Sequence, residues 1–231
     1  MLLALQLPEW VEPVARYILT VGLPATLRVS AIAVTGSTII GITLGTLITI
    51  RFLPSQLLIR GYIEVFRGLP ILVTVFIVFL GLPEISSTFK FSPLTSAALA
   101  LVLWGSAQVA EATRGAVQSI PREQHEAAEA LGFGWVGRHA WVILPQARRR
   151  LLPPFVSLVV NIIQNSTLAA AIGGIEILQA ANSQYQRLSY PEPIGIGEIH
   201  AAEIFAGTAI LFFLISFPLT RLAAMLEKRL V

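Results

Sequence analysis

The chain has 231 residues, of which 55% are hydrophobic and 13% are charged, about half the charged fraction of an ordinary soluble domain. This composition excludes a typical soluble enzyme and predicts a polytopic membrane protein, since one crossing takes ~20 apolar residues. There is no cysteine or aspartate, and the three histidines are far apart in the sequence, so we expect no metal site and no Ser-His-Asp triad. The net charge of +3 comes mostly from arginines beside apolar stretches, which favours a role in membrane topology over nucleic acid binding.

Five apolar segments are each long enough to cross a bilayer as a helix. They are residues 22–50, 57–82, 93–119, 152–173 and 200–226. No part of the sequence has the alternating ~10-residue stretches that are typical of barrel strands. The sequence therefore predicts an all-α fold, a polytopic membrane helical bundle with five transmembrane helices, in which residues 1–231 form a single transmembrane domain.

Glycine and proline predict two local features of this bundle. In the first segment, Gly41 and Gly45 are four residues apart, so a neighbouring helix can approach closely there. In the second segment, Gly68 and Pro70 are expected to bend the helix near the cytoplasmic interface.

The basic residues predict the orientation. Twelve of the 16 Lys and Arg residues lie on one side of the predicted membrane, around residues 51–67, 114–150 and 221–229. Because basic residues gather on the cytoplasmic side, five crossings place the N-terminus outside and the C-terminus in the cytoplasm.

Residues 119–150 are expected to form a structured cytoplasmic loop, because the stretch is long and rich in helix formers. We predict a helix over 122–131, a turn at Gly132 and a second short helix over 135–142, which Pro145 ends. The loop is too short to bury all of its apolar side chains, so several are expected to lie at a protein interface or on the membrane surface. They are Leu131, Phe133, Trp135, Val136 and Trp141.

The loop also carries a spaced motif. Glu126-Ala127-Ala128 is followed after three residues by Gly132, and after nine more by Val142, one residue and Leu144-Pro145. This pattern resembles the loop signature of permease subunits of ABC-type importers, with Val142 where Ile is commoner. The polar amino acid uptake family, the histidine/glutamine/arginine type, is further resembled by residues 66–72, 81–83, 109–116, 119–121, 142–147 and 152–154.

The resemblance implies an amino acid importer of the prokaryotic plasma (inner) membrane. In such an importer a second permease subunit, identical or paralogous, completes the path, and an extracytoplasmic amino acid binding protein delivers the substrate. A pair of cytoplasmic ATP-binding subunits receives the loops. ATP and Mg²⁺ are expected in that partner, because neither lysine of this chain follows a glycine and no Walker A loop exists.

Two groups of candidate residues follow. The residues expected to couple the chain to the ATPase are Glu126, Ala127, Ala128, Ala130, Leu131, Gly132, Phe133, Trp135, Arg138, Leu144 and Pro145. Polar side chains inside membrane segments normally face the interior of a bundle, so they are candidates to line the substrate path. They are Arg67, Gln108, Glu111, Ser157, Asn161, Gln164, Asn165 and Ser166.

Two alternatives stay open at this point. Polar groups such as Ser157 and Asn161 also hydrogen-bond between helices for stability alone, and Arg67 is well placed as a topology anchor. An ATP-independent secondary transporter or channel, or a structural membrane protein, would also be helical, although a transporter of that kind is expected to show repeats or broken helices around a coupling-ion site.

Overall fold

The computed structural model describes residues 8–49, 53–190 and 200–230, and within these ranges the regular secondary structure is entirely helical. The chain begins with α1 (Val11–Tyr17), η1 (Ile18–Gly22) and α2 (Leu23–Leu47), which run on from one another as a single helix. The elements that follow are α3 (Leu53–Gly68), α4 (Ile71–Phe76), η2 (Ile77–Gly81), α5 (Leu82–Ile85), η3 (Ser87–Phe89), α6 (Pro93–Gln118), α7 (Arg122–Ala130), α8 (Trp135–Gly137), η4 (Arg138–Ile143), α9 (Leu144–Asn165), η5 (Ser166–Ile172), α10 (Ile177–Ser189) and α11 (Ala201–Leu230).

Among the described residues, four helices are long and apolar enough to cross a membrane. They are Val11–Leu47, Pro93–Gln118, Trp135–Ile172 and Ala201–Lys228. A bent pair of helices, Pro54–Gly68 and Ile71–Ile85, brings the number to five if it counts as one span. The predicted fold class, an all-α membrane bundle, is confirmed.

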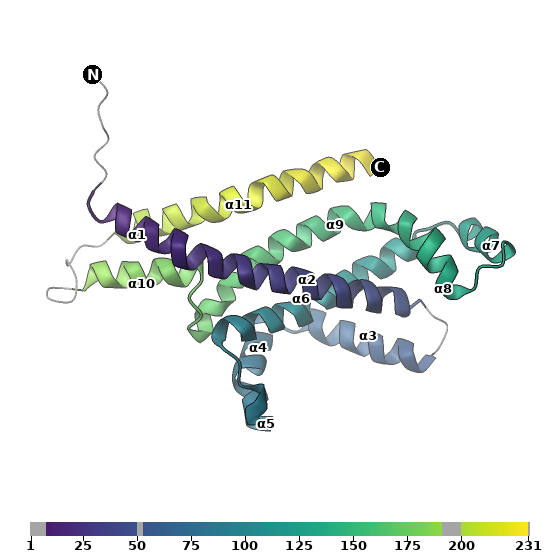
Figure 1. Ribbon diagram of the computed structural model, residues 1–231, viewed down its shortest axis with the longest axis horizontal. Coiled ribbons are helices and arrows are strands. Elements are labelled where there is room, and N and C mark those ends of the chain that lie inside the picture. The colour runs from purple at the N-terminus through teal and green to yellow at the C-terminus, as the bar shows by residue number, and fades with distance from the viewer. Residues whose placement is uncertain (1–7, 50–52, 191–199, 231) are drawn as a thin grey trace, which may run out of the picture.

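The predicted second span, residues 57–82, was wrong as a single helix. The chain turns by 107° between Gly68 and Ile71. Pro70 has φ −58° and ψ 132°, and its ψ lies outside the helical region. Because proline lacks an N–H and its ring obstructs the preceding turn, α3 cannot continue through it. The expected bend at this place is therefore a complete break, and α4 leaves the direction of α3 (Figure 1).

Two further boundaries differ from the prediction. The first long helix begins at Val11, eleven residues before the expected start. Pro145 does not end the second loop helix, which continues without interruption from Trp135 to Ile172. The wider π-helical turn of η4 directly precedes Pro145, so the proline is at the start of a regular α segment and its missing N–H breaks no α-helical ladder.

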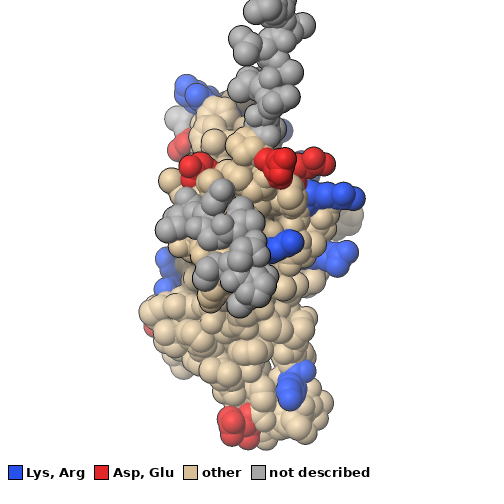
Figure 2. Space-filling view, turned by 90° about the vertical axis from the view of Figure 1, so that its left-hand side faces the viewer, with Lys and Arg blue, Asp and Glu red and all other residues tan. Residues whose placement is uncertain are grey.

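The helices α2, α6 and α9 lie lengthwise beside one another and form the centre of the molecule (Figure 1). Helices α7 and α8 lie at one end, together with the end of α11, while α1 and α10 lie at the opposite end. Viewed from that opposite end, charged side chains of both signs gather in the upper half of the visible surface and at its lower tip, and the area between them is mostly uncharged (Figure 2).

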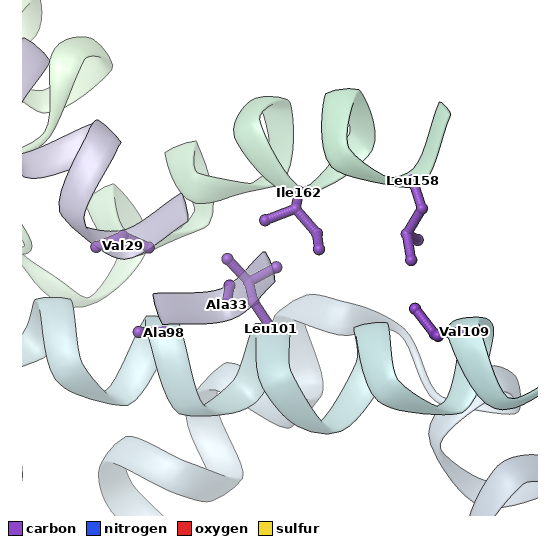
Figure 3. Packing of buried hydrophobic residues seen from close by; sticks show 7 residues of the cluster. All are labelled: Val29, Ala33, Ala98, Leu101, Val109, Leu158 and Ile162. Carbon is purple, nitrogen blue, oxygen red and sulfur yellow. The ribbon is translucent and has the colours of Figure 1, made fainter. Parts of the chain in front are cut away.

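One hydrophobic cluster joins the three central helices, as Figure 3 shows. Its members are Val29 and Ala33 from α2, Ala98, Leu101 and Val109 from α6, and Leu158 and Ile162 from α9. Each is buried, so the relative positions of α2, α6 and α9 are fixed by their packing.

The glycines of α2 allow the closest part of this packing. A Cβ atom on Gly41 would lie 2.4 Å from the Cβ atom of Val109, and one on Gly45 would lie 2.4 Å from the carbonyl oxygen of Ala110. These separations are far below a normal contact, so only glycine fits. The predicted close approach at Gly41 and Gly45 is confirmed, and the neighbouring helix is α6.

Helix α10 was not predicted from the sequence. The carboxylate of Glu176 is fully buried and accepts hydrogen bonds from the backbone amides of Leu178 and Gln179, both at 2.9 Å. The amide of Ile177 donates to the hydroxyl of Thr26 at 3.1 Å, which attaches the start of α10 to α2. These hydrogen bonds satisfy the backbone amides of Ile177, Leu178 and Gln179, which have no partner within the helix.

Candidate functional site

The turn of the coupling loop, residues 119–150, is built by Gly132. Its φ of +81° lies in the left-handed region that favours glycine. The amide of Phe133 donates to the carbonyl of Ala128 at 3.1 Å, and the amide of Gly132 donates to that of Glu129 at 2.9 Å. This pair of bonds is a Schellman motif, which ends α7 and reverses the chain toward α8.

The loop presents an apolar surface. Leu131 is 79% exposed, Val136 is 71% exposed and Trp141 is 76% exposed, and Phe133 is also exposed beside them in the sequence. Such side chains in water mark a surface that another molecule covers. The fifth predicted residue, Trp135, differs, because it is half-buried and its ring stacks on His139 at 4.2 Å between centroids.

The opposite side of the loop is anchored to the bundle. Ile143 and Ala147 are buried against Ala116, Val117 and Ile120 at the end of α6. The predicted residue Leu144 packs partly against the same cluster. The loop is therefore an extension of the transmembrane core and not a loose connection.

Polar contacts hold the two loop helices together. The Arg138 guanidinium donates to Glu129 at 3.1 Å, and the side chain of Gln146 donates to that of Gln124 at 3.1 Å. Glu126 forms an exposed ion pair with Arg122 within α7, a type of contact worth about 0.3–0.5 kcal/mol. Glu126 thus contributes little to the loop's own stability and presents its carboxylate to the surroundings.

The remaining predicted loop residues differ in their exposure to solvent. Ala127 and Ala130 are exposed on α7, whereas Ala128 is buried beneath the turn. Pro145 is exposed at the start of α9.

A second feature is a groove of about 470 Å³ between α6 and α9, whose mainly apolar lining includes a few polar side chains. Three of the predicted path residues, Gln108, Ser157 and Asn161, line it together with Trp104 and Phe155. Among the described residues that line the groove there is no charged side chain. Such a surface offers neutral hydrogen-bonding groups beside aromatic rings, which suits a small polar solute.

The other predicted path residues lie elsewhere. Glu111 is held by both the Nε and Nη2 atoms of Arg114, and Arg67 lies 3.8 Å away from the same carboxylate. This cluster joins the end of α3 to α6, so Glu111 and Arg67 do not reach the groove lining.

Gln164 is exposed one turn beyond Asn161 on α9. The side chain of Asn165 donates to the carbonyl of Asn161 at 2.8 Å. Ser166 is fully buried and donates to the carbonyl of Ile163 at 2.7 Å, within its own helix. The structure thus brings together Gln108, Ser157 and Asn161, and leaves Ser166 outside the groove.

Some residues of these sites had no sequence signal of their own. Trp104 and Phe155 were indistinguishable from lipid-facing apolar residues. The ring of His139, one of the three histidines of the sequence, forms an unexpected contact with Thr49. No group of three or more metal-ligating side chains occurs in the described part of the chain.

Comparisons with known proteins agree with this architecture. Residues 37–231 match the family described as binding-protein-dependent transport system inner membrane component. The chain is 31% identical to the glutamine transport system permease protein GlnP of Escherichia coli (strain K12), over 90% of this chain and 91% of that protein. It is 37% identical to the probable amino-acid ABC transporter permease protein YckA of Bacillus subtilis (strain 168), over 69% of this chain and 70% of that protein.

Among solved structures, a chain from the crystal structure of an amino acid ABC transporter with histidines superposes with a TM-score of 0.79. The alignment covers 96% of this chain and 99% of that chain at 24% identity, so it establishes the fold. The family match decides against an ATP-independent carrier or a purely structural protein. The chain belongs to the binding-protein-dependent transport system inner membrane components, the non-enzymatic permease subunits of ABC transporters.

Proposed function

We propose that this chain is the membrane-spanning permease domain, residues 1–231, of an ATP-driven amino acid importer. The observation that carries the proposal is the uncharged, mainly apolar groove between α6 and α9, in which Gln108, Ser157 and Asn161 lie beside two aromatic rings. An amino acid has balanced main-chain charges, so it suits such a surface better than an ion of one sign does. The similar permeases GlnP and YckA, described as glutamine and amino-acid permeases, support this substrate class.

The groove forms half of the path in this proposal. Ser157, Asn161 and Gln164 are exposed along α9, and a polar face exposed to lipid would be costly. A second permease subunit, identical or paralogous, is therefore expected to cover this face and to complete the passage.

Uptake tests the groove. Asn161→Leu removes a hydrogen-bonding group from the groove, and we expect the uptake of the transported amino acid to fall at least tenfold with normal amounts of protein in the membrane. The matched control is Thr43→Val, which removes an exposed hydroxyl from α2 that donates only to the carbonyl of Ile39 in its own helix, outside the groove. Equal uptake by the two variants would remove the groove from the path.

The coupling loop is proposed to dock on a pair of cytoplasmic ATP-binding subunits, which hold ATP and Mg²⁺. Support comes from the exposed apolar side chains Leu131, Val136 and Trp141 on a loop that is fixed to α6. Gly132→Asp or Glu126→Lys should abolish transport while the chain still inserts into the membrane. Uptake at the normal rate in either variant would contradict the docking role.

We infer that the loop and the C-terminal end of α11 face the cytoplasm, and that α1 and α10 face outward, where an amino acid binding protein would dock. The end that carries α7 and α8 also carries Arg122, Arg138 and residues 148–150, as the positive-inside rule requires. Since the natural chain has no cysteine, single cysteines at Trp141 and Glu84 can be labelled with an impermeant maleimide. Only the cysteine at Glu84 should react in intact cells.

A further inference from the structure

A hollow of about 620 Å³ lies between the first and the last residues of the coupling loop. It shares no lining residue with the groove between α6 and α9. Its walls are Ile120 and Pro121 at the start of the loop, and Pro145, Gln146 and residues 148–150 at its end. Three consecutive arginines thus face one space. None of the described residues that line it is acidic.

The arginines of the hollow are not neutralised by the protein. Arg150 donates to the backbone carbonyl of Ser119 at 2.6 Å, a contact that leaves its charge uncompensated. Arg148 and Arg149 are exposed, and no acidic side chain of the described residues lies within 4.0 Å of them. By contrast, both arginines between residues 119 and 147 pair with a glutamate.

In the proposed orientation, the length of α6 puts the hollow near the level of the lipid headgroups. Helix α6 has 26 residues, which corresponds to ~39 Å, close to the thickness of a bilayer with its headgroups. Its end at Gln118 therefore lies near the cytoplasmic membrane surface. The bond from Arg150 to Ser119 places the arginines at this same level, and the apolar part of α9 begins directly afterwards at Leu151.

We propose that this hollow binds the phosphate group of an anionic membrane phospholipid. Guanidinium groups bind phosphate oxygens through paired, charge-assisted hydrogen bonds, and basic pockets at the cytoplasmic membrane surface are suited to anionic headgroups. A free phosphate shares this chemistry, but the position of the hollow at the membrane surface favours a lipid, because the phosphate of a lipid is already held at that level. One wall belongs to the start of the loop and the other to its end, so a bound headgroup connects the two.

Native mass spectrometry of the purified chain in detergent tests the site directly. Phosphatidylglycerol and phosphatidylcholine with the same acyl chains are titrated separately, and we expect tighter binding of phosphatidylglycerol. The double variant Arg148→Gln, Arg149→Gln should bind phosphatidylglycerol about thirtyfold more weakly, or about fivefold for each arginine lost. The single variant Arg148→Gln, about fivefold weaker, provides the same test if the double variant does not fold.

The matched control is the double variant Arg16→Gln, Arg187→Gln, which removes the same charge from exposed positions on α1 and α10. Its affinity for phosphatidylglycerol should equal that of the natural chain. Equal binding of the two lipids by the natural chain, or equal affinities of the Arg148 and control variants, would overturn the proposal. Displacement of phosphatidylglycerol by millimolar inorganic phosphate would assign the hollow to free phosphate and would likewise overturn the proposal of a lipid site.

Discussion

The Nε2 atom of His139 lies 3.3 Å from the hydroxyl oxygen of Thr49, which joins the coupling loop to the end of the first long helix. The Nδ1 atom of the same ring lies 2.9 Å from the carbonyl oxygen of Trp135, to which it donates. In the neutral ring Nε2 is then an acceptor, and the hydroxyl proton of Thr49 can serve either this nitrogen or the carbonyl of Thr46 at 2.6 Å. The contact thus links the loop to the end of α2, in addition to its direct continuation into α9.

The contact between Thr49 and His139 predicts an energetic coupling. In a double-mutant cycle with Thr49→Val and His139→Phe, we expect a coupling free energy of about 0.5–1.5 kcal/mol from thermal unfolding in detergent. His139→Phe keeps an aromatic ring against Trp135, so it isolates the hydrogen bond from the stacking. Strictly additive effects of the two substitutions would mean that the contact carries no energy.

The loop is predicted to loosen in acid. Burial, and then the positive charge of Arg138, lower the pKa of His125 below its ordinary value of ~6.5. Between the lowered and the ordinary pKa the unfolded loop binds more protons than the folded loop. Stability is therefore complete above pH ~6.5 and falls as the pH falls through this window.

Amide hydrogen exchange measures this loosening. After correction for intrinsic rates, protection of residues 122–143 should be lower at pH 5.5 than at pH 7.5, and His125→Gln should reduce the difference. His200→Gln, at the other end of the molecule, is the control and should leave the difference unchanged. A difference of the same size in both variants would rule out His125 as its source.

The left-handed turn predicts that glycine is required at position 132 but not at position 134. Gly132→Ala forces an L residue into φ +81°, which should lower the free energy of unfolding by about 1–2 kcal/mol. The space around the position is open, so this cost comes from the backbone and not from a clash. Gly134 has φ −66° and open space, so Gly134→Ala should cost far less. Capture of the ATP-binding subunit from membranes should fall only for Gly132→Ala, and equal capture by both variants would mean that the turn does not limit docking.

The contact of α2 with α6 predicts a second matched pair of glycine variants. Gly41→Ala places a Cβ atom against Val109 and the carbonyl of Ser106, both on a packed helix, and should destabilise the chain by about 1–3 kcal/mol. Gly61→Ala, on α3, meets nothing within 4 Å and should leave the midpoint of thermal unfolding unchanged or raise it. A lower midpoint for Gly61→Ala than for Gly41→Ala would contradict the packing.

Elements with local signals were predictable from the sequence. The third span was expected at 93–119 and is α6 at Pro93–Gln118, because Pro93 and the cap at Ser92, whose hydroxyl accepts from the amide of Thr95, mark its start. The loop motif was likewise recognisable, in this case because its residues and spacing resemble a known family signature. Each of these signals lies within a few residues of the feature that it marks.

Features that depend on distant partners were not predictable. Helix α10 is capped by Glu176, a residue type with a weak preference for the N-cap, and its first residue, Ile177, is fixed by Thr26, 151 residues earlier. The groove depends on which side of α9 faces α6, so the roles of Trp104 and Phe155 emerged only from packing. The uninterrupted passage through Pro145 required the π turn, for which the sequence has no simple pattern.

The helix that runs from Trp135 to Ile172 without a break carries two of the surfaces described above. The exposed Trp141 of the loop lies near one end, and Ser157 and Asn161 of the groove lie further along. Since each residue turns a helix by ~100° and advances it by ~1.5 Å, the number of residues between Trp141 and Ser157 sets the angle between these two surfaces. An insertion of one residue there would leave both surfaces intact and point them in incompatible directions. In the proposed function the spacing along this stretch is therefore itself a requirement, which insertions and deletions between the two surfaces would test independently of the side chains that fill it.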